Sequence, residues 1–453
     1  MARISDRLPP REEFLIQGAE ILTMDPALGD FAGGDIHVRN GEIIAVGHGL
    51  SAPNAAVIDA RKKIALPGFV DTHWHLWNGL FRGLVGFYDP KLTYFPMKVR
   101  LGPHYTPEDM YRAVQLSLAE ALASGITCVH NWAHNIVVPE HADANILAHL
   151  ETGLRGRFSY GWAEGQPDQD TMDLEDLSRV QREWFSDSGL LTLGVALRGA
   201  EGPRPEDRRD AYLREFEVAR RLGVPITTHV AQHRAAARHS KAIAALGRDG
   251  LLGPDVQLVH AIHATPEDRQ MMAEAGTHLS LSPFTELQVG MGFPQTTEML
   301  DAGILVSLSV DTLAVTNSDM FATMRAIIDV EHARHENQNL TMRRVLEMAT
   351  IDGARDLGLD HLIGSLTPGK RADFILVGID QINMSTLESA DWVRLLVHHA
   401  QTSNIDLVSV DGRILKRDGK PVMLDEKRII HDALLSTKAI MERAGLHAPQ
   451  RRS

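Results

Sequence analysis

The feature that most constrains the fold of this chain is a regular alternation of short apolar segments with helical segments between residues 63 and 335. Thr106-Pro107-Glu108 places an N-cap residue and a first-turn proline at a helix start, and Gly125 follows that helix as a C-cap. The predicted strands are residues 63–70, 126–130, 156–162, 190–197, 223–229, 256–260, 278–283 and 303–311. Eight strand–helix units in succession predict a closed barrel.

Histidine and aspartate residues gather at the C-terminal ends of four of these strands. His73 and His75 are two residues apart, so they point to the same side of their strand. His229, His260 and Asp311 end three other strands. Because the strand ends of one barrel converge on one mouth, we expect these five side chains to lie together. Imidazole and carboxylate groups are metal ligands, so the pattern predicts a metal site.

Short strands near both ends of the chain form a second pattern. Asn40-Gly41 and Asp411-Gly412 each separate two predicted strands and are strong hairpin signals. Two β segments at opposite ends of one chain predict a single β domain built from both. We therefore expect residues 1–66 as the first part of a β-sandwich, residues 67–363 as the barrel, and residues 364–453 as the second part with a C-terminal helix.

Composition and charge exclude several classes of function. The net charge of −13 argues against nucleic acid and anionic membranes as partners. The N-terminal residues lack the apolar stretch of a signal peptide, and no apolar run is long enough to span a bilayer. The single cysteine, Cys128, leaves no disulfide framework. We expect a cytoplasmic protein that acts on a small molecule and forms a dimer or tetramer.

Several motifs resemble those of the amidohydrolase superfamily. They are Pro67–His75, Thr228–His229, Val259–Ala261, Ser309–Asp311 and Gly364–Leu376. The resemblance covers nearly the whole chain and is closest to the triazine and nucleobase-type metal-dependent aminohydrolases. It implies a distorted (β/α)8 TIM barrel with a composite β-sandwich domain.

The same resemblance implies a set of metal ligands, namely His73, His75, His229 and Asp311. Relatives with two metal ions bridge them with a lysine from a middle strand. This chain has no lysine between Lys98 and Lys241, so we predict one divalent ion. Three imidazoles and a carboxylate suit Zn²⁺ or Fe²⁺, with Zn²⁺ preferred.

The resemblance also implies the catalytic groups. Asp311 would accept a proton from the attacking water, and His260 would polarise the substrate. The alternative roles for His260 are a fifth metal ligand and a structural histidine. Many deaminases of this superfamily carry a glutamate three residues after the ligand at His229, and here that position is Gln232. A neutral amide cannot relay a proton. Proton transfer then falls to His260 with Asp311, or to His233, or the reaction is not ring deamination.

Aromatic residues are concentrated in the segment after the first barrel strand. They are Trp74, Trp77, Phe81, Phe87, Tyr88, Tyr94, Phe95 and Tyr105. This segment is expected to overhang the barrel mouth and to suit a flat ring substrate, the alternatives being a lid packed on itself or a subunit interface. Within it, we predict Trp74, Trp77 and Arg82 as substrate contacts. Gln232 and Glu286 are predicted contacts from other strand ends, and Glu286 could replace the missing glutamate.

These residues together predict a metal-dependent hydrolase that cleaves a C–N bond. The favoured reaction is hydrolytic loss of ammonia or an amine from a planar N-heterocycle. The alternatives are ring opening of a cyclic amide or imidazolone, and a metal-retaining binding protein without turnover.

Overall fold

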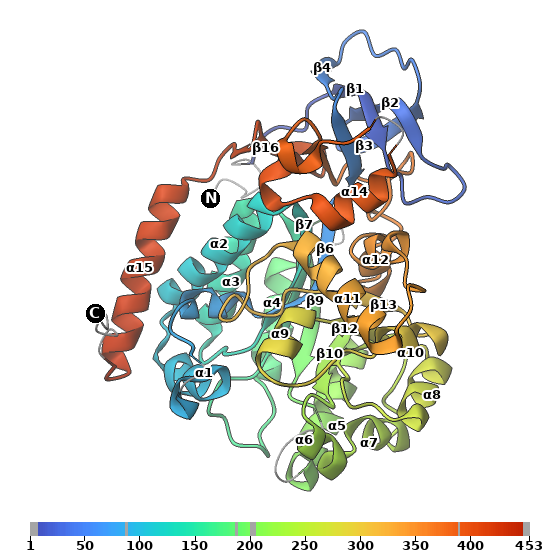
Figure 1. Cartoon of the computed structure of the whole chain (residues 1–453). Coiled ribbons are helices and arrows are strands. Elements are labelled where there is room, and N and C mark those ends of the chain that lie inside the picture. Colours follow the sequence, from blue (N-terminus) through green and yellow to red (C-terminus); the bar gives the residue numbers. More distant parts are fainter. Residues whose placement is uncertain (1–7, 87–88, 186–188, 200–204, 388–389, 447–453) are drawn as a thin grey trace.

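The computed structural model of this protein describes residues 8–86, 89–185, 189–199, 205–387 and 390–446. Two sheets organise it, one closed into a barrel and one built from both ends of the chain (Figure 1). Of the predicted aromatic segment, Phe87 and Tyr88 lie outside the described residues. Within the described ranges, no helix combines the length and apolar character that crossing a membrane requires.

The barrel consists of eight parallel strands that neighbour one another in sequence order. They are β6 (Phe69–Trp74), β7 (Ile126–Ala133), β8 (Arg155–Gly161), β9 (Leu191–Leu197), β10 (Ile226–Val230), β11 (Val256–His260), β12 (His278–Leu281) and β13 (Val306–Leu308). Seven of them correspond to predicted strands. The strand predicted at 63–70 is divided, because residues 63–67 form β5 (Lys63–Pro67) of the second sheet and the barrel strand begins at Phe69. The barrel strands are buried because helices cover the outside of the barrel. The predicted distorted (β/α)8 barrel is therefore confirmed.

Fifteen α-helices occur in the described parts of the chain. They are α1 (Tyr94–Leu101), α2 (Pro107–Ala123), α3 (Pro139–Thr152), α4 (Leu174–Trp184), α5 (Pro205–Leu222), α6 (Arg234–Ser240), α7 (Ala242–Arg248), α8 (Pro266–Ala275), α9 (Pro283–Gln288), α10 (Thr296–Asp301), α11 (Met320–His335), α12 (Met342–Met348), α13 (Ile351–Asp356), α14 (Trp392–His399) and α15 (Glu426–Arg443). The predicted start of α2 is present, since Thr106 and Asp109 form a capping box. Helix α15 runs along α2 on the outside of the barrel (Figure 1).

The second sheet has nine strands in the order β17-β16-β15-β14-β5-β1-β2-β3, with β4 paired to β1. The strands are β1 (Phe14–Ile21), β2 (Phe31–Arg39), β3 (Glu42–Gly47), β4 (Ala56–Asp59), β5 (Lys63–Pro67), β14 (Phe374–Gly378), β15 (Ile405–Val410), β16 (Arg413–Arg417) and β17 (Lys420–Pro421). Asn40 and Gly41 join β2 to β3 with φ of 53° and 85°, as a mirror-image turn requires. Pairing of β5 with β14 unites the two chain ends in one sheet, while the exact domain limits stay a prediction.

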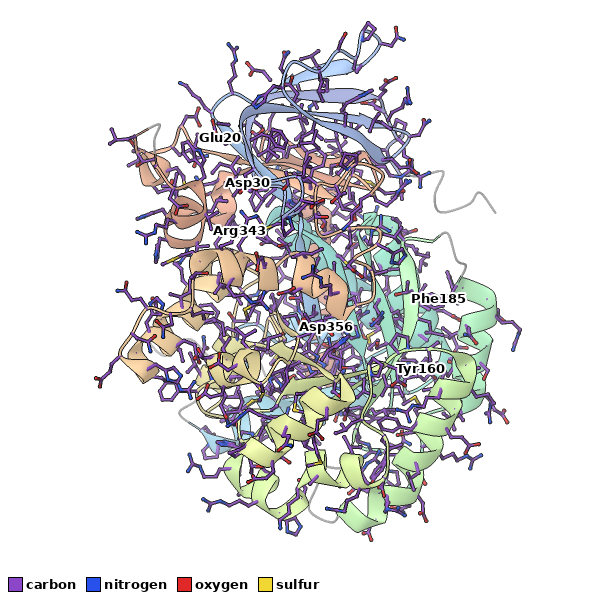
Figure 2. The ribbon with its side chains drawn as sticks, turned by 90° about the vertical axis from the view of Figure 1, so that its right-hand side faces the viewer. Glu20, Asp30, Tyr160, Phe185, Arg343 and Asp356 are labelled. Carbon is purple, nitrogen blue, oxygen red and sulfur yellow. The ribbon has the colours of Figure 1, made fainter. Side chains whose placement is uncertain are left out.

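Ion pairs join this sheet to the barrel. Arg155 in β8 donates to Asp373 through Nε at 2.7 Å and Nη2 at 3.1 Å, and both side chains are buried. Arg343 of α12 donates to Asp30 in the loop between β1 and β2 at 2.7 Å (Figure 2). These contacts fix the second sheet at one end of the barrel. The C-terminal ends of the barrel strands lie at the other end.

Candidate metal centre and active site

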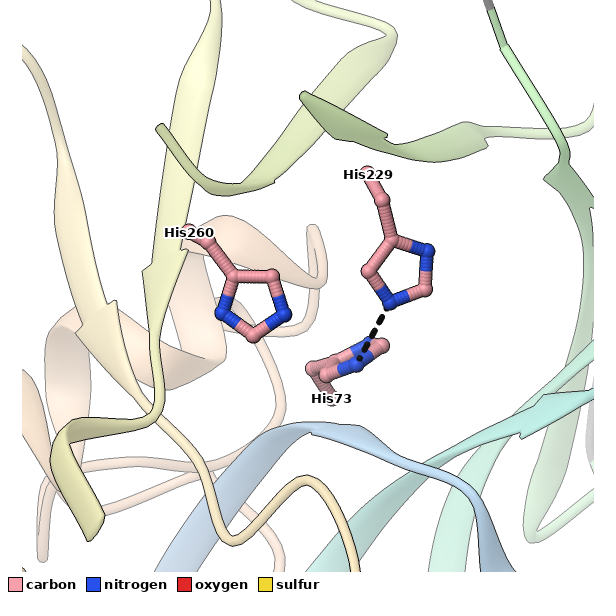
Figure 3. Close-up of side chains that lie close together, drawn as sticks. All are labelled: His73, His229 and His260. Atoms are coloured by element: carbon pink, nitrogen blue, oxygen red, sulfur yellow. Dashed lines mark hydrogen bonds between the residues drawn. The ribbon is translucent and has the colours of Figure 1, made fainter. Parts of the chain in front are cut away.

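Five side chains from four strand ends come together at the barrel mouth. Nε2 of His73 lies 3.2 Å from Nε2 of His229 and 3.3 Å from Oδ1 of Asp311. Nε2 of His75 lies 3.4 Å from the same Asp311 oxygen, and Nε2 of His260 lies 3.8 Å from Asp311 Oδ2. Figure 3 shows His73, His229 and His260 converging from three separate strands. The structure thus brings together all the predicted ligands and the predicted His260.

The backbone fixes this cluster by closing the barrel at the same point. Asp311 follows β13 and pairs with Trp74 of β6, so the last strand meets the first. The Asp311 N–H donates to the His73 carbonyl at 2.9 Å, and the His75 N–H donates to the Asp311 carbonyl at 2.7 Å. Asp311 and His260 have φ of 66° and 71°, which non-glycine residues adopt rarely and at sites where side chains are aimed for function.

Burial keeps the imidazoles in the form that binds metals. The pKa of His73 is lowered, and the pKa values of His75 and His229 lie well below 6.5, chiefly because burial disfavours the charged ring. Neutral imidazole is the metal-binding species. The cluster therefore offers uncharged nitrogen ligands beside one carboxylate at neutral pH.

The spacing of these atoms fits a divalent metal ion. Ligand atoms about 2.05 Å from a tetrahedral Zn²⁺ lie about 3.3 Å from one another. The His73–His229, His73–Asp311 and His75–Asp311 distances of 3.2, 3.3 and 3.4 Å agree with that edge length. Lone pairs directed at one another at this distance repel unless a cation or proton lies between them. The residues present can therefore hold a divalent metal ion.

Glu286 lies behind His260 and fixes its ring. Oε1 of Glu286 lies 3.1 Å from Nδ1 of His260 and also accepts the backbone N–H of Ser282 at 2.8 Å. Glu286 is fully buried, and burial raises its pKa. The contact leaves Nε2 of His260 directed at the cluster, so Glu286 orients a neighbouring ring.

A cavity of about 310 Å³ opens above the cluster. Its floor is His75, His229, His260 and Asp311, and Trp132 and Trp162 form an aromatic wall with ring centroids 5.1 Å apart. Tyr94, Phe95 and Lys98 of α1, which we call the lid helix, close it from the side of the predicted aromatic segment. A flat ring has the shape that such a wall accommodates.

Of the five predicted substrate contacts, one lines this cavity and four lie outside its wall. Gln232 lines the cavity, whereas Trp74, Trp77, Arg82 and Glu286 are not among its described lining residues. Trp74 is fully buried in the core, and Trp77 donates its indole N–H to Nδ1 of His134 at 3.2 Å. Arg82 is half exposed and pairs with Glu120. The predicted direct contact with substrate therefore finds support in this cavity for Gln232 alone among the five residues.

The sequence interpretation missed Trp132, the aromatic side chain nearest the cluster. Its ring centroid lies 4.2 Å from that of His229 and 4.9 Å from that of His75. The second strand was expected to end at His130 but continues to Ala133. Trp132 shares the parity of His130, so period-two alternation along a longer strand could have identified it.

Comparison with known proteins agrees with this geometry. The amidohydrolase family profile matches residues 64–415. The 5'-deoxyadenosine deaminase of Methanosarcina mazei is 29% identical over 451 residues, 95% of this chain and 99% of that protein. The 5-methylthioadenosine/S-adenosylhomocysteine deaminase of Moorella thermoacetica is 31% identical over 389 residues, 82% of this chain and 86% of that protein.

Solved structures share the fold at lower identity. Atrazine chlorohydrolase from Arthrobacter aurescens, complexed with zinc, has a TM-score of 0.83 at 22% identity, covering 94% of this chain and 100% of that one. An adenosine deaminase from Xanthomonas campestris with bound zinc has a TM-score of 0.83 at 22% identity, covering 96% and 100%. From the profile match over most of its length, the barrel and the relatives, this chain belongs to the amidohydrolase family.

Proposed function

We propose that this protein is a hydrolytic deaminase that releases ammonia or an amine from a planar N-heterocycle. One observation carries the proposal: the buried His/Asp cluster forms the floor of a cavity walled by Trp132 and Trp162. The cluster suits hydrolysis, and the wall suits a flat ring. Relatives named as deaminases match nearly the whole chain and support the reaction type.

A single divalent ion held by His73, His75, His229 and Asp311 is part of this proposal. The three ligand-atom distances near 3.3 Å support it. The donor set of imidazoles and a carboxylate suits Zn²⁺ first and Fe²⁺ second. When bound, such an ion lowers the pKa of water from about 15.7 to about 7 and so supplies hydroxide at neutral pH.

Asp311 carries the proton in the proposed reaction. Its carboxylate takes one proton from the attacking water as the new C–O bond forms at the ring carbon. It then gives that proton to the departing nitrogen as the C–N bond breaks, so the amine leaves neutral. One water is consumed and one amine released, and Asp311 returns to its starting state.

His260 and Gln232 act on the ring in this scheme. Glu286 holds Nδ1 of His260 at 3.1 Å, so the Nε2 edge faces the cluster, where charge develops during attack. Gln232 lines the cavity and offers an amide that can donate to a ring nitrogen without transferring its proton. Asp311 and His260 therefore carry out the proton transfer that a titrating side chain at position 232 would otherwise share.

The most informative first substrates come from the relatives. Because they act, by name, on 5'-deoxyadenosine, 5-methylthioadenosine and S-adenosylhomocysteine, aminopurine nucleosides head the panel. Amino-substituted triazines follow, since a triazine hydrolase shares the fold. A cytoplasmic location and a dimer or tetramer stay predictions.

Ammonia release by Zn²⁺-loaded protein across this panel tests the proposal. We expect turnover of at least one aminated heterocycle, and Asp311→Asn is expected to reduce it by about 10²-fold or more because the proton acceptor is lost. A ring-opened carboxylate without ammonia would favour cyclic amide hydrolysis instead. No hydrolysis of aminated heterocycles, lactams or amidines would overturn an enzymatic role.

A further inference from the structure

A continuous line of polar contacts connects the lid helix with the candidate metal centre. Nζ of Lys98 lies 2.8 Å from Oε1 of Glu164, and Nε2 of His134 lies 3.0 Å from the same oxygen. Nδ1 of His134 lies 3.1 Å from Nδ1 of His75. The four residues come from α1, the loop after β8, the segment after β7 and the segment after β6. Three of the four residues lie in loops or just beyond strand ends. Their contacts therefore form only when the barrel is folded.

The indole of Trp77 fixes the proton positions along this line. Indole N–H can only donate, and it donates to Nδ1 of His134 at 3.2 Å. Nδ1 of His134 is therefore an acceptor, and its proton is on Nε2, which faces the Glu164 carboxylate. The Trp132 carbonyl is the other partner within reach of Nδ1 and is more distant, at 3.4 Å, than the Trp77 indole nitrogen.

The tautomer of His75 follows from that of His134. Two facing ring nitrogens need one proton between them, and Nδ1 of His134 has none to give. Nδ1 of His75 is therefore the donor, and its Nε2 carries a lone pair. That Nε2 lies 3.4 Å from Oδ1 of Asp311, inside the cluster. The line thus presents the correct nitrogen of His75 to a metal ion.

Charge is balanced along the line although its members are nearly inaccessible to water. The side chains of His134, Glu164 and Lys98 are 1%, 6% and 17% exposed. Burial opposes ionisation of Glu164, but Lys98 and His134 outweigh it and lower the pKa of Glu164 to about 2. The Glu164 carboxylate therefore lies between the ammonium of Lys98 and the imidazole of His134, within ion-pair distance of both.

We propose that Lys98, Glu164 and His134 are positioning residues that hold His75 in its metal-binding tautomer and tie that ligand to the lid helix. Partners outside the ligand set commonly orient a ligating imidazole and raise its basicity, and their loss typically costs 10- to 100-fold in metal affinity. Here the partner of the ligand is a second histidine, His134, and the Glu164 carboxylate beside it pairs with Lys98 of the cavity wall. The inference rests on the proposed metal site and adds residues to it.

The test compares metal affinity in Glu164→Gln and in the wild-type protein, with Co²⁺ as the probe. Glu164→Gln keeps the side-chain size and removes the charge that faces His134. We expect the Co²⁺ dissociation constant, measured by chelator competition, to rise about 10-fold or more, and the visible Co²⁺ spectrum to change. We expect kcat to decrease and KM to change little, since the cavity wall keeps its shape.

Matched variants separate positioning from general damage. Asp168→Asn removes a carboxylate from the same cavity, where it pairs with Arg198 at 3.1 Å, and is expected to leave Co²⁺ affinity within about 2-fold. Lys98→Met should weaken Co²⁺ binding in the same direction as Glu164→Gln, and Lys98→Arg should restore it. The two Lys98 variants also decide the matter if Glu164→Gln does not fold.

Each outcome bears on the inference. Unchanged Co²⁺ affinity and spectrum in folded Glu164→Gln, or in Lys98→Met if only that variant folds, would overturn the positioning role. Wild-type protein that binds no Co²⁺ would overturn both this role and the ligand set. Wild-type protein that binds Co²⁺ tightly but releases no ammonia would contradict the proposed function alone, because affinity is measured without substrate.

Discussion

The backbone N–H of Asp311 donates to the carbonyl of His73 at 2.9 Å, so two proposed metal ligands also close the barrel. The first strand, β6, and the segment after the last, β13, meet at the point where their side chains face one cluster. The same backbone contacts therefore close the barrel and place the proposed metal ligands next to one another. A metal ion at this point would hold the barrel shut as well as supply hydroxide.

Removal of the metal is therefore expected to destabilise the whole barrel. A ligand that binds only the folded state stabilises it by an amount that grows with its concentration relative to the dissociation constant. Chelation should lower the thermal midpoint by roughly 3 °C or more, and added Zn²⁺ should restore it. Differential scanning calorimetry measures this, and equal midpoints with and without chelator would contradict a metal that bridges β6 and Asp311.

Gln232→Glu is expected to alter the pH dependence of turnover. The side chain lines the cavity, so a carboxyl there adds a titrating group next to the substrate. The profile of kcat/KM against pH should gain a limb that the wild-type protein lacks. Gln270→Glu on the exposed surface of α8 is the control and should leave the profile unchanged. Identical profiles for wild type and Gln232→Glu would place this side chain outside the chemistry.

The ion pair under the barrel is expected to be a major contribution to stability. Asp373 is buried and accepts from Nε and Nη2 of Arg155 and from the backbone N–H of Asp411. Asp373→Ala leaves Arg155 buried without its main partner, which typically costs about 3–5 kcal/mol. Urea denaturation measures the loss. Asp59→Ala, which removes an exposed pair with Arg61, should have little effect, and similar results for both variants would contradict the assignment.

Acid sensitivity is expected to come partly from His149. This buried ring lies 3.4 Å from the carbonyl of Arg155, and burial lowers its pKa to about 4. The unfolded chain therefore binds the proton first as the pH falls. The contribution is complete above pH 6.5 and is lost progressively between about 6.5 and about 4, to a total of about 3 kcal/mol.

His149→Gln measures that contribution. Its unfolding free energy, determined in urea at pH 7.5 and pH 5, should fall less between the two values than that of the wild-type protein. His431→Gln, at an exposed position on α15, is the matched control and should retain the wild-type dependence. An equal pH dependence in His149→Gln would show that this ring does not control it.

Much of this architecture could be predicted because it follows local periodicity. Seven of the barrel strands and the strand ends at His73, His75, His229 and Asp311 depend on apolar runs and period-two alternation, which the sequence displays directly. Alternation also explains the position of Trp74: it lies between His73 and His75, so its side chain points away from the cluster into the core. The proximity of Trp74 to two ligands in sequence was misleading about its place in space.

The remaining parts of the site depend on contacts that no local pattern encodes. Glu164 and Lys98 meet across 66 positions of the chain, from a loop and a lid helix, and only the folded barrel brings them together. Trp132 entered the site because β7 runs three residues beyond its expected end, and strand ends are the least predictable part of an element.

Metal content is the most direct test of the central claim that these strand ends form one metal site. Elemental analysis of wild-type protein, purified without chelator, should find close to one equivalent of a divalent metal per chain. His229→Ala removes the ligand nitrogen that lies 3.2 Å from His73 Nε2 and should reduce the content well below one equivalent, whereas the exposed-surface variant His431→Ala should retain it. Undiminished metal in folded His229→Ala would contradict the ligand assignment.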